Sequence, residues 1–170
     1  VLPALDELRF DLAITRDNFL DESKYAHLEI YKDQLLVVVS KKNPYVKRFS
    51  ISMKELSNDN FIVFDKVTDL HKLIIEECRN NGFEPTIFYS SHRKVSVFSL
   101  IGANIGIALI PSKVYEYHKH PDVVAIPLEE TIECNLVLVY LKNRKLPRTA
   151  TSFIEFLHNQ IKERESQQNL

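Results

Sequence analysis

Residues 94–111 constrain the fold more than any other stretch, because they read as a helix, a tight turn and a buried strand in immediate succession. Apolar residues within 97–101 follow the helical spacing i, i+3, i+4, which predicts a helix face turned toward a core. Asn104 then stands where the chain needs a residue that tolerates left-handed backbone angles. The run 107–110 is continuously apolar, as in strands covered on both faces, and Pro111 ends its hydrogen-bonding ladder. Such a unit is typical of an open α/β sheet, in which ligands bind beyond the strand ends.

The rest of the chain continues as mixed strands and helices, which predicts the α/β class. Strands are predicted at 10–14, within 29–40, and at 61–64, 86–89, 107–110, 123–126 and 132–141. Helices are predicted at 2–8, 50–56, 70–81, 94–101 and 112–117, and from 147 onward. The last helix has an expected inner face of Phe153, Ile154, Phe156, Leu157 and Ile161.

Composition excludes several functions. The 22 basic and 23 acidic residues leave a net charge of −1, so no global field favours nucleic acid or an anionic membrane. No apolar run approaches the roughly 20 residues of a membrane helix, and no basic leader precedes residue 16. Cys78 and Cys134 both fall in buried parts of predicted elements, which favours reduced thiols and a cytoplasmic location over a disulfide.

Motifs for a cofactor, a metal or catalysis are also missing. With only 3 Gly the chain has no phosphate-binding loop, and neither GxGxxG, GxxxxGK[ST] nor GxSxG occurs. His118 and His120, with Lys119 between them, favour a solvated turn over a zinc site. We therefore expect no cofactor, no metal and no catalytic residue.

Five segments in a fixed order identify a family resemblance. They are Leu5–Ile14, Asp33–Pro44, Ile51–Leu56, Cys78–Pro85 and Gly106–Pro111. Together they resemble the effector-binding domain of LysR-type transcriptional regulators, from about residue 5 to about residue 161. Two positions depart from the family pattern, because Leu8 and Asn104 stand where the family usually has Gly.

The resemblance implies a periplasmic-binding-protein type II-like fold, in which two Rossmann-like lobes are joined by two crossover segments. Lobe I is expected at 1–43 and 128–170 and lobe II at 44–127. The first strand and first helix of lobe I, and the DNA-binding helix-turn-helix, are expected before Val1, so that DNA is bound only through that missing domain. Homodimers or tetramers are expected, as for regulators that read two half-sites.

Two helix N-termini are candidates for holding a small anion between the expected lobes, because free N–H groups and the helix dipole favour negative charge. The first carries Thr68, Asp69 and Leu70, which match positions that contact ligand in similar regulators. Thr68 or Asp69 could instead simply cap the helix. The charge of Asp69 would repel a carboxylate unless Lys66 offsets it.

The second candidate follows the strand at 86–89 and carries Ser90, Ser91 and His92 beside Arg93. Hydroxyls, an imidazole and a guanidinium could clamp an anion, although Ser91 could instead cap the helix while Arg93 points to water. Lobe I would contribute Thr15 and Arg16, which follow the strand at 10–14.

The function implied is a regulatory domain that senses a small, anionic effector and so controls DNA binding and transcription. The alternative is a transporter-type solute-binding protein of the same fold, and the residues before Val1 would separate the two. A third possibility, an enzyme such as a deaminase with these lobes, lacks any acid/base or nucleophile constellation.

Overall fold

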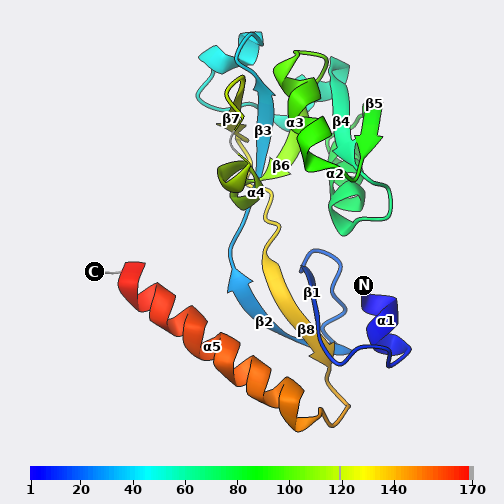
Figure 1. Cartoon of the computed structure of the whole chain (residues 1–170). Coiled ribbons are helices and arrows are strands. Elements are labelled where there is room, and N and C mark those ends of the chain that lie inside the picture. The colour runs from blue at the N-terminus through cyan, green and yellow to red at the C-terminus, as the bar shows by residue number, and fades with distance from the viewer. Residues whose placement is uncertain (119, 169–170) are drawn as a thin grey trace. The chain divides into compact units, whose positions relative to one another are not determined.

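A computed structural model describes residues 1–118 and 120–168. Lys119 of the expected solvated turn and the last two residues of the expected lobe I lie outside the described residues. The chain divides into two compact units (Figure 1). Unit 1 comprises Val1–Lys32 and Asn135–Leu170, and unit 2 comprises Asp33–Cys134.

These divisions fall at different residues from the expected lobe boundaries. Strand β3 (Leu35–Ser40), expected in lobe I, pairs with β6 (Ala108–Pro111) and β7 (Val123–Pro127) and therefore belongs to unit 2. The strand predicted within 29–40 is β3, and the strand before it, β2 (Tyr25–Tyr31), was not predicted. Asp33 lies between these two strands, and its Oδ1 accepts hydrogen bonds from Gln34 N (2.9 Å), Ser112 Oγ (2.7 Å) and Lys113 N (3.2 Å).

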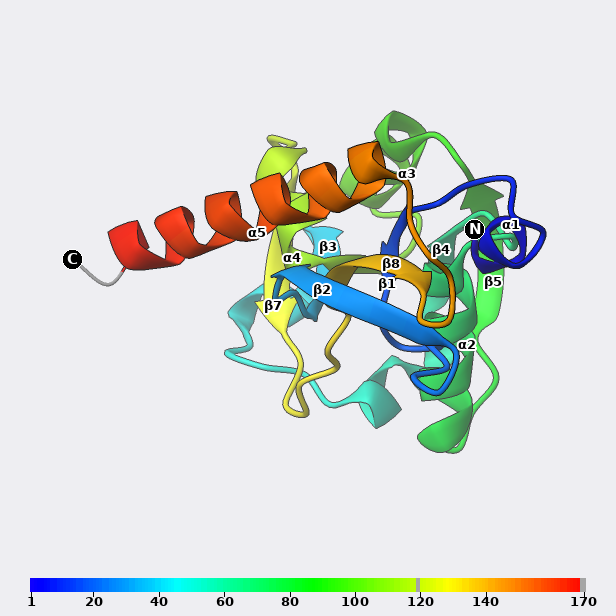
Figure 2. The same cartoon turned by 90° about the horizontal axis from the view of Figure 1, so that it is seen from below.

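Unit 1 is built on an antiparallel sheet in the order β1 (Ala13–Arg16), β8 (Leu136–Leu141), β2. Two helices belong to the same unit, α1 (Leu2–Asp6) and α5 (Arg148–Gln168). Helix α1 contacts β8, and α5 contacts β2 (Figures 1 and 2). Its core consists of Leu5, Ala13, Tyr25, Val137 and Val139.

The expected inner face of α5 is only partly correct. Ile161 is buried, but Phe153 is 44% and Phe156 59% exposed. Helical spacing locates an apolar face, and only tertiary packing decides how much of it is covered.

Strand β1 begins three residues later than predicted because the chain first folds back on α1. The backbone N–H groups of Arg9 and Phe10 donate to the carbonyl of Ala4, at 2.9 and 3.3 Å. The reversal passes through Leu8, whose φ is +58°. This is the left-handed region, which disfavours a residue with a Cβ. Leu8 therefore adopts backbone angles for which glycine is the default residue.

Unit 2 contains two sheets. One has the antiparallel order β6–β3–β7, and the other pairs β4 (Asn60–Phe64) and β5 (Thr86–Ser91) in parallel. The N–H of Ile62 donates to the carbonyl of Ile107 at 2.7 Å, and the N–H of Ile107 donates to the carbonyl of Asn60 at 2.9 Å. These bonds join β4 to the start of β6, so the two sheets form one hydrogen-bonded layer.

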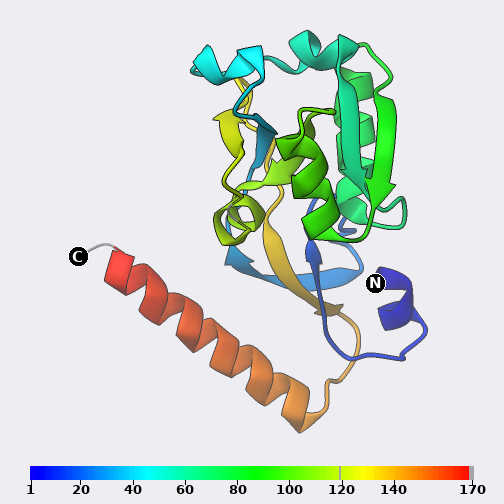
Figure 3. The ribbon, with the colours of Figure 1, turned by 45° about the horizontal axis from the view of Figure 1, so that its top comes forward.

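Helices pack on this layer (Figure 3). They are α2 (Asp69–Asn80), α3 (Lys94–Gly102), α4 (Ser112–Tyr117) and the short 3₁₀ turns Pro44–Lys47 and Met53–Asn58. The core between α3 and the strands includes Ile62, Val97, Phe98, Ile101 and Ile110. The predicted helix at 94–101 is therefore confirmed, and so is the left-handed residue after it, since Asn104 has a φ of +58°.

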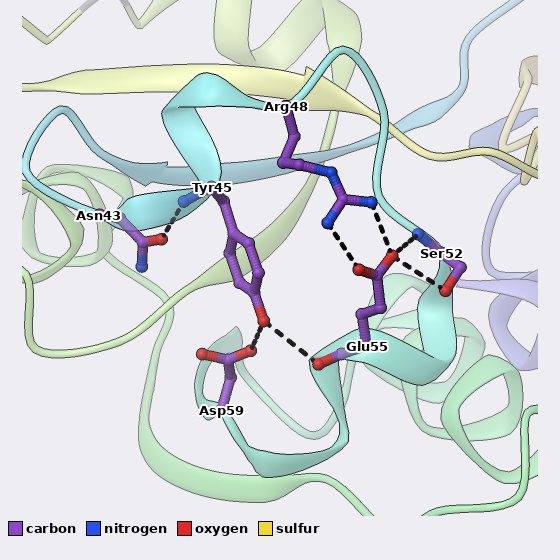
Figure 4. A network of polar contacts seen from close by, with 6 residues as sticks. All are labelled: Asn43, Tyr45, Arg48, Ser52, Glu55 and Asp59. Atoms are coloured by element: carbon purple, nitrogen blue, oxygen red, sulfur yellow. Dashed lines mark hydrogen bonds and ion pairs between the residues drawn. The ribbon is translucent and has the colours of Figure 1, made fainter.

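A polar network ties together the two 3₁₀ turns between β3 and β4 (Figure 4). Tyr45 Oη donates to Asp59 Oδ2 at 2.9 Å, and burial together with this bond raises the pKa of Tyr45 to about 12. Arg48 bonds both carboxylate oxygens of Glu55, at 2.7 and 3.3 Å, and lowers the pKa of that carboxyl. Glu55 also accepts a hydrogen bond from the N–H of Ser52 at 3.0 Å, as in a capping box at the start of the second turn.

Both cysteines are fully buried free thiols, as predicted. Burial raises the pKa of Cys78 to about 12, so it is inert as a nucleophile at neutral pH. Among the described helices, none has the length and apolar composition needed to cross a membrane.

Candidate functional site

The carboxyl edge of the β4–β5 pair is where the candidate residues of unit 2 gather. In this parallel register Val63 lies opposite Ser90 and Phe64 opposite Ser91, so both strands end together. Each strand leads into a helix, β4 into α2 and β5 into α3, and Figure 3 shows the two strands side by side. Ligands of α/β proteins bind at this end of parallel strands, where helix N-termini supply unpaired N–H groups.

The carbonyl oxygen of Phe64 is the centre of this edge. His71 Nδ1 lies 3.0 Å from it, and Ser90 Oγ donates to it at 3.4 Å. A carbonyl can only accept, so the His71 nitrogen that faces it carries the proton. The last residue of β4, the first turn of α2 and the end of β5 are thereby held at one point.

Thr68 caps α2. Its Oγ1 accepts a hydrogen bond from the N–H of His71 at 3.1 Å and donates to the carbonyl of Asp65 at 2.8 Å. Thr68 therefore has the capping role that the sequence suggested, and the residue is exposed. Asp69 is the first residue of the helix and is half-buried. Leu70 packs against the core cluster of unit 2, so part of its side chain is committed to packing.

The residues expected after β5 are placed differently from the prediction. Ser90 and Ser91 are the last two residues of the strand, which runs two residues further than expected. Ser91 is not the N-cap of α3, because Arg93 occupies that position, and Ser91 Oγ instead accepts from the N–H of Arg93 at 3.1 Å. His92 lies between them and is exposed.

Thr15 and Arg16 belong to unit 1, apart from the residues just described. They are the last two residues of β1 and lie opposite Val137 and Leu136, rather than following the strand as predicted. Thr15 is buried and Arg16 half-buried. The structure thus groups Thr68 and Ser90 around one carbonyl and leaves Thr15 and Arg16 on a separate sheet.

His71 is the residue that sequence reasoning missed. The residue is only 9% exposed, although it was not among the candidate residues. One clue was available, because His71 follows the cap residue by three positions and so shares its helix face.

Chemically, the edge offers hydroxyls, one imidazole and backbone N–H groups. In residues 1–118 and 120–168, no group of three or more His, Cys, Asp or Glu side chains is arranged to hold a metal ion. This arrangement suits the binding of a small polar molecule by hydrogen bonds.

The sequence of this chain matches a known protein family. Residues 1–162 match the family model described as LysR substrate binding domain. The chain is 28% identical to the uncharacterized HTH-type transcriptional regulator YwbI of Bacillus subtilis over 136 residues. This alignment covers 79% of the chain and 45% of YwbI. The chain is 24% identical over 129 residues to the transcriptional dual regulator GltC of the same organism, with 75% and 43% covered. The chain therefore spans less than half the length of these regulators.

Solved structures show the same fold. The effector-binding domain of QuiR in complex with shikimate matches with a TM-score of 0.76 and 24% identity, over 95% of this chain and 77% of that one. The CcmR regulatory domain of Synechocystis PCC6803 in complex with 2-PG matches with a TM-score of 0.80 and 13% identity, over 92% and 76%. These matches confirm the predicted two-lobed, periplasmic-binding-protein type II-like α/β class. On the match across residues 1–162, this chain belongs to the LysR substrate binding domain family.

Proposed function

We propose that this domain binds a small anionic effector at the carboxyl edge of β4 and β5. Thr68, Ser90 and Ser91 would supply hydroxyls, the first turns of α2 and α3 would supply N–H groups, and Asp69, Leu70 and His92 would border the ligand. Thr15 and Arg16 are proposed as contacts from unit 1.

The convergence of His71 and Ser90 on the Phe64 carbonyl carries this proposal. The 3.4 Å bond from Ser90 is long for a hydroxyl, so a ligand oxygen can replace the carbonyl as partner at little cost. Two structural neighbours support this proposal, because QuiR was solved in complex with shikimate and CcmR in complex with 2-PG.

Occupancy of this site would control transcription by the full-length regulator. The relatives are about twice as long as the matched region and are described as HTH-type or dual regulators, so we assign DNA contact to a separate helix-turn-helix domain. A regulator that binds DNA acts in the cytoplasm, and a two-fold dimer suits paired half-sites. A shift of population between two states of the domain would transmit the signal.

A thermal-shift screen tests the binding site. Shikimate, 2-PG, inorganic phosphate and a panel of small organic acids are added to the wild type, to Ser90→Ala and to Ser99→Ala. Ser99 is an exposed serine on α3 and serves as the matched control. We expect at least one anion to stabilise the wild type and Ser99→Ala, and to bind Ser90→Ala tenfold more weakly or worse, the equivalent of about 1.4 kcal/mol. Equal affinity for the two serine variants would place the site elsewhere.

A further inference from the structure

The Phe64 carbonyl has two side-chain donors, and the two hydrogen bonds differ in quality. Because a carbonyl can only accept, His71 Nδ1 donates to it, at 3.0 Å. Ser90 Oγ donates to the same oxygen at 3.4 Å. A carbonyl oxygen has two lone pairs, so these two donors fill it. The nitrogen bond has an ordinary length, whereas the hydroxyl bond is long for its type.

His71 is held in place independently of Ser90. Its backbone N–H donates to Thr68 Oγ1 at 3.1 Å, so the cap of α2 fixes the turn that carries the ring. The residue is nine-tenths buried, which leaves the ring little room to turn away from the carbonyl. A buried donor that leaves its partner loses free energy. The bond from His71 to Phe64 is therefore the permanent one of the two.

Ser90 is in a different position, because it is half-buried and its hydroxyl has a single proton to donate. To bond an anion, this hydroxyl must turn away from the Phe64 carbonyl. The residue Phe64 is itself buried, so a carbonyl that lost its only side-chain donor would lose free energy. Since His71 stays bonded, the carbonyl keeps a partner and the Ser90 hydroxyl is free to turn.

We propose that His71 is a positioning residue of the anion site, which keeps the Phe64 carbonyl bonded so that Ser90 Oγ can donate to the effector. This inference rests on the proposed function and deepens it, and it requires no contact between His71 and the ligand. An aliphatic side chain at position 71 would fill the space without giving the carbonyl a donor. The carbonyl would then hold the Ser90 hydroxyl in competition with the ligand.

A double-mutant cycle without any ligand tests whether the two side chains share the carbonyl. The midpoint of thermal unfolding is compared with and without Ser90→Ala, in the wild type and in a His71→Leu background. We expect a loss below about 2 °C in the wild type, and of about 4 °C or more where the other donor is gone. His71→Asn keeps an amide nitrogen where Nδ1 stood, so in that background the loss should be small again. Equal losses in the wild type and in His71→Leu would overturn the inference.

The same variants are then titrated by calorimetry with inorganic phosphate, shikimate and 2-PG. For an anion that binds the wild type, His71→Leu should bind about tenfold more weakly or worse, and His71→Asn within about threefold of the wild type. Ser99→Ala, the control on α3, should bind like the wild type. In a Ser90→Ala background His71→Leu should change the affinity less than about twofold, because the hydroxyl that His71 releases is gone. A merely structural role would weaken binding equally in both backgrounds, and that result would overturn the inference.

A measurement on the wild type itself does not depend on whether a variant folds. ¹⁵N NMR of the neutral His71 ring should find the proton on Nδ1 with and without the anion, and a proton on Nε2 would overturn the inference. Binding that Ser90→Ala weakens and His71→Leu does not would overturn it while the proposed function stands. If none of the three anions binds the wild type, the proposed function fails and the role of His71 fails with it.

Discussion

A Cβ atom at Gly106 would lie 2.4 Å from the carbonyl oxygen of Asn60, closer than any real contact of that kind. The same carbonyl accepts the N–H of Ile107 at 2.9 Å, so the approach is part of the bond network that joins β4 to β6. The glycine before the buried strand is therefore required by this backbone contact, and it lies in the layer that carries the candidate site.

Gly106→Ala should destabilise unit 2. Relief of the clash needs a backbone shift that weakens the bonds between β4 and β6, and overpacking of this kind costs about 1–3 kcal/mol. Chemical denaturation followed by circular dichroism would measure the loss. Asn104→Gly, in the turn just before, is the control and should change stability little, because glycine accepts the φ of +58° that Asn104 already adopts. An unchanged free energy of unfolding in Gly106→Ala would show that the contact is not as tight as described.

Leu8→Gly should stabilise unit 1. Leu8 has a φ of +58°, which costs a residue with a Cβ about 1–2 kcal/mol, and its side chain is 58% exposed, so little packing is lost. The greater conformational freedom of glycine in the unfolded chain offsets about 0.5–1 kcal/mol of this gain. The net stabilisation by difference is therefore at most about 1.5 kcal/mol. Leu8→Ala keeps the Cβ and the strain and should show no gain. Equal stability of the two variants would contradict strain at this turn.

The Tyr45 phenol should stabilise the protein up to high pH and then stop doing so. Burial and the bond to Asp59 raise its pKa from 10.0 to about 12. A group whose pKa is raised on folding gives its full stabilisation below the unfolded value and loses it as the pH passes the folded value. The difference in unfolding free energy between the wild type and Tyr45→Phe should therefore be constant below pH 10 and shrink between pH 10 and about 12. Denaturation series at several pH values would measure it, and a difference that shrinks already below pH 10 would contradict the assignment.

Much of unit 2 could be predicted from local sequence, because local chemistry decides it. The apolar spacing of 94–101 and the conformational tolerance of Asn104 suffice for α3 and the turn after it. Thr68 was predictable as a cap for the same reason, since capping depends on neighbours a few residues away.

Features that depend on distant partners were missed. Strand β2 was not predicted, because its hydrogen-bonding partner β8 lies far along the chain. The burial of His71 depends on the carbonyl at the end of β4, which a helical repeat does not reveal. The late start of β1 follows from two bonds back to Ala4, where an apolar run alone suggests a strand.

Two substitutions of Thr68 test whether the carboxyl edge of β4 and β5 binds an anion. Thr68→Asn and Thr68→Asp both provide a good helix cap, so α2 should remain intact and both variants should fold like the wild type. They differ in one negative charge placed at the proposed site. Calorimetry with the acid that most stabilises the wild type should give an affinity for Thr68→Asn within a few-fold of the wild type. For Thr68→Asp we expect at least a tenfold loss, or about 1.4 kcal/mol. Equal affinities for the two variants would contradict an anion site at the carboxyl edge of β4 and β5.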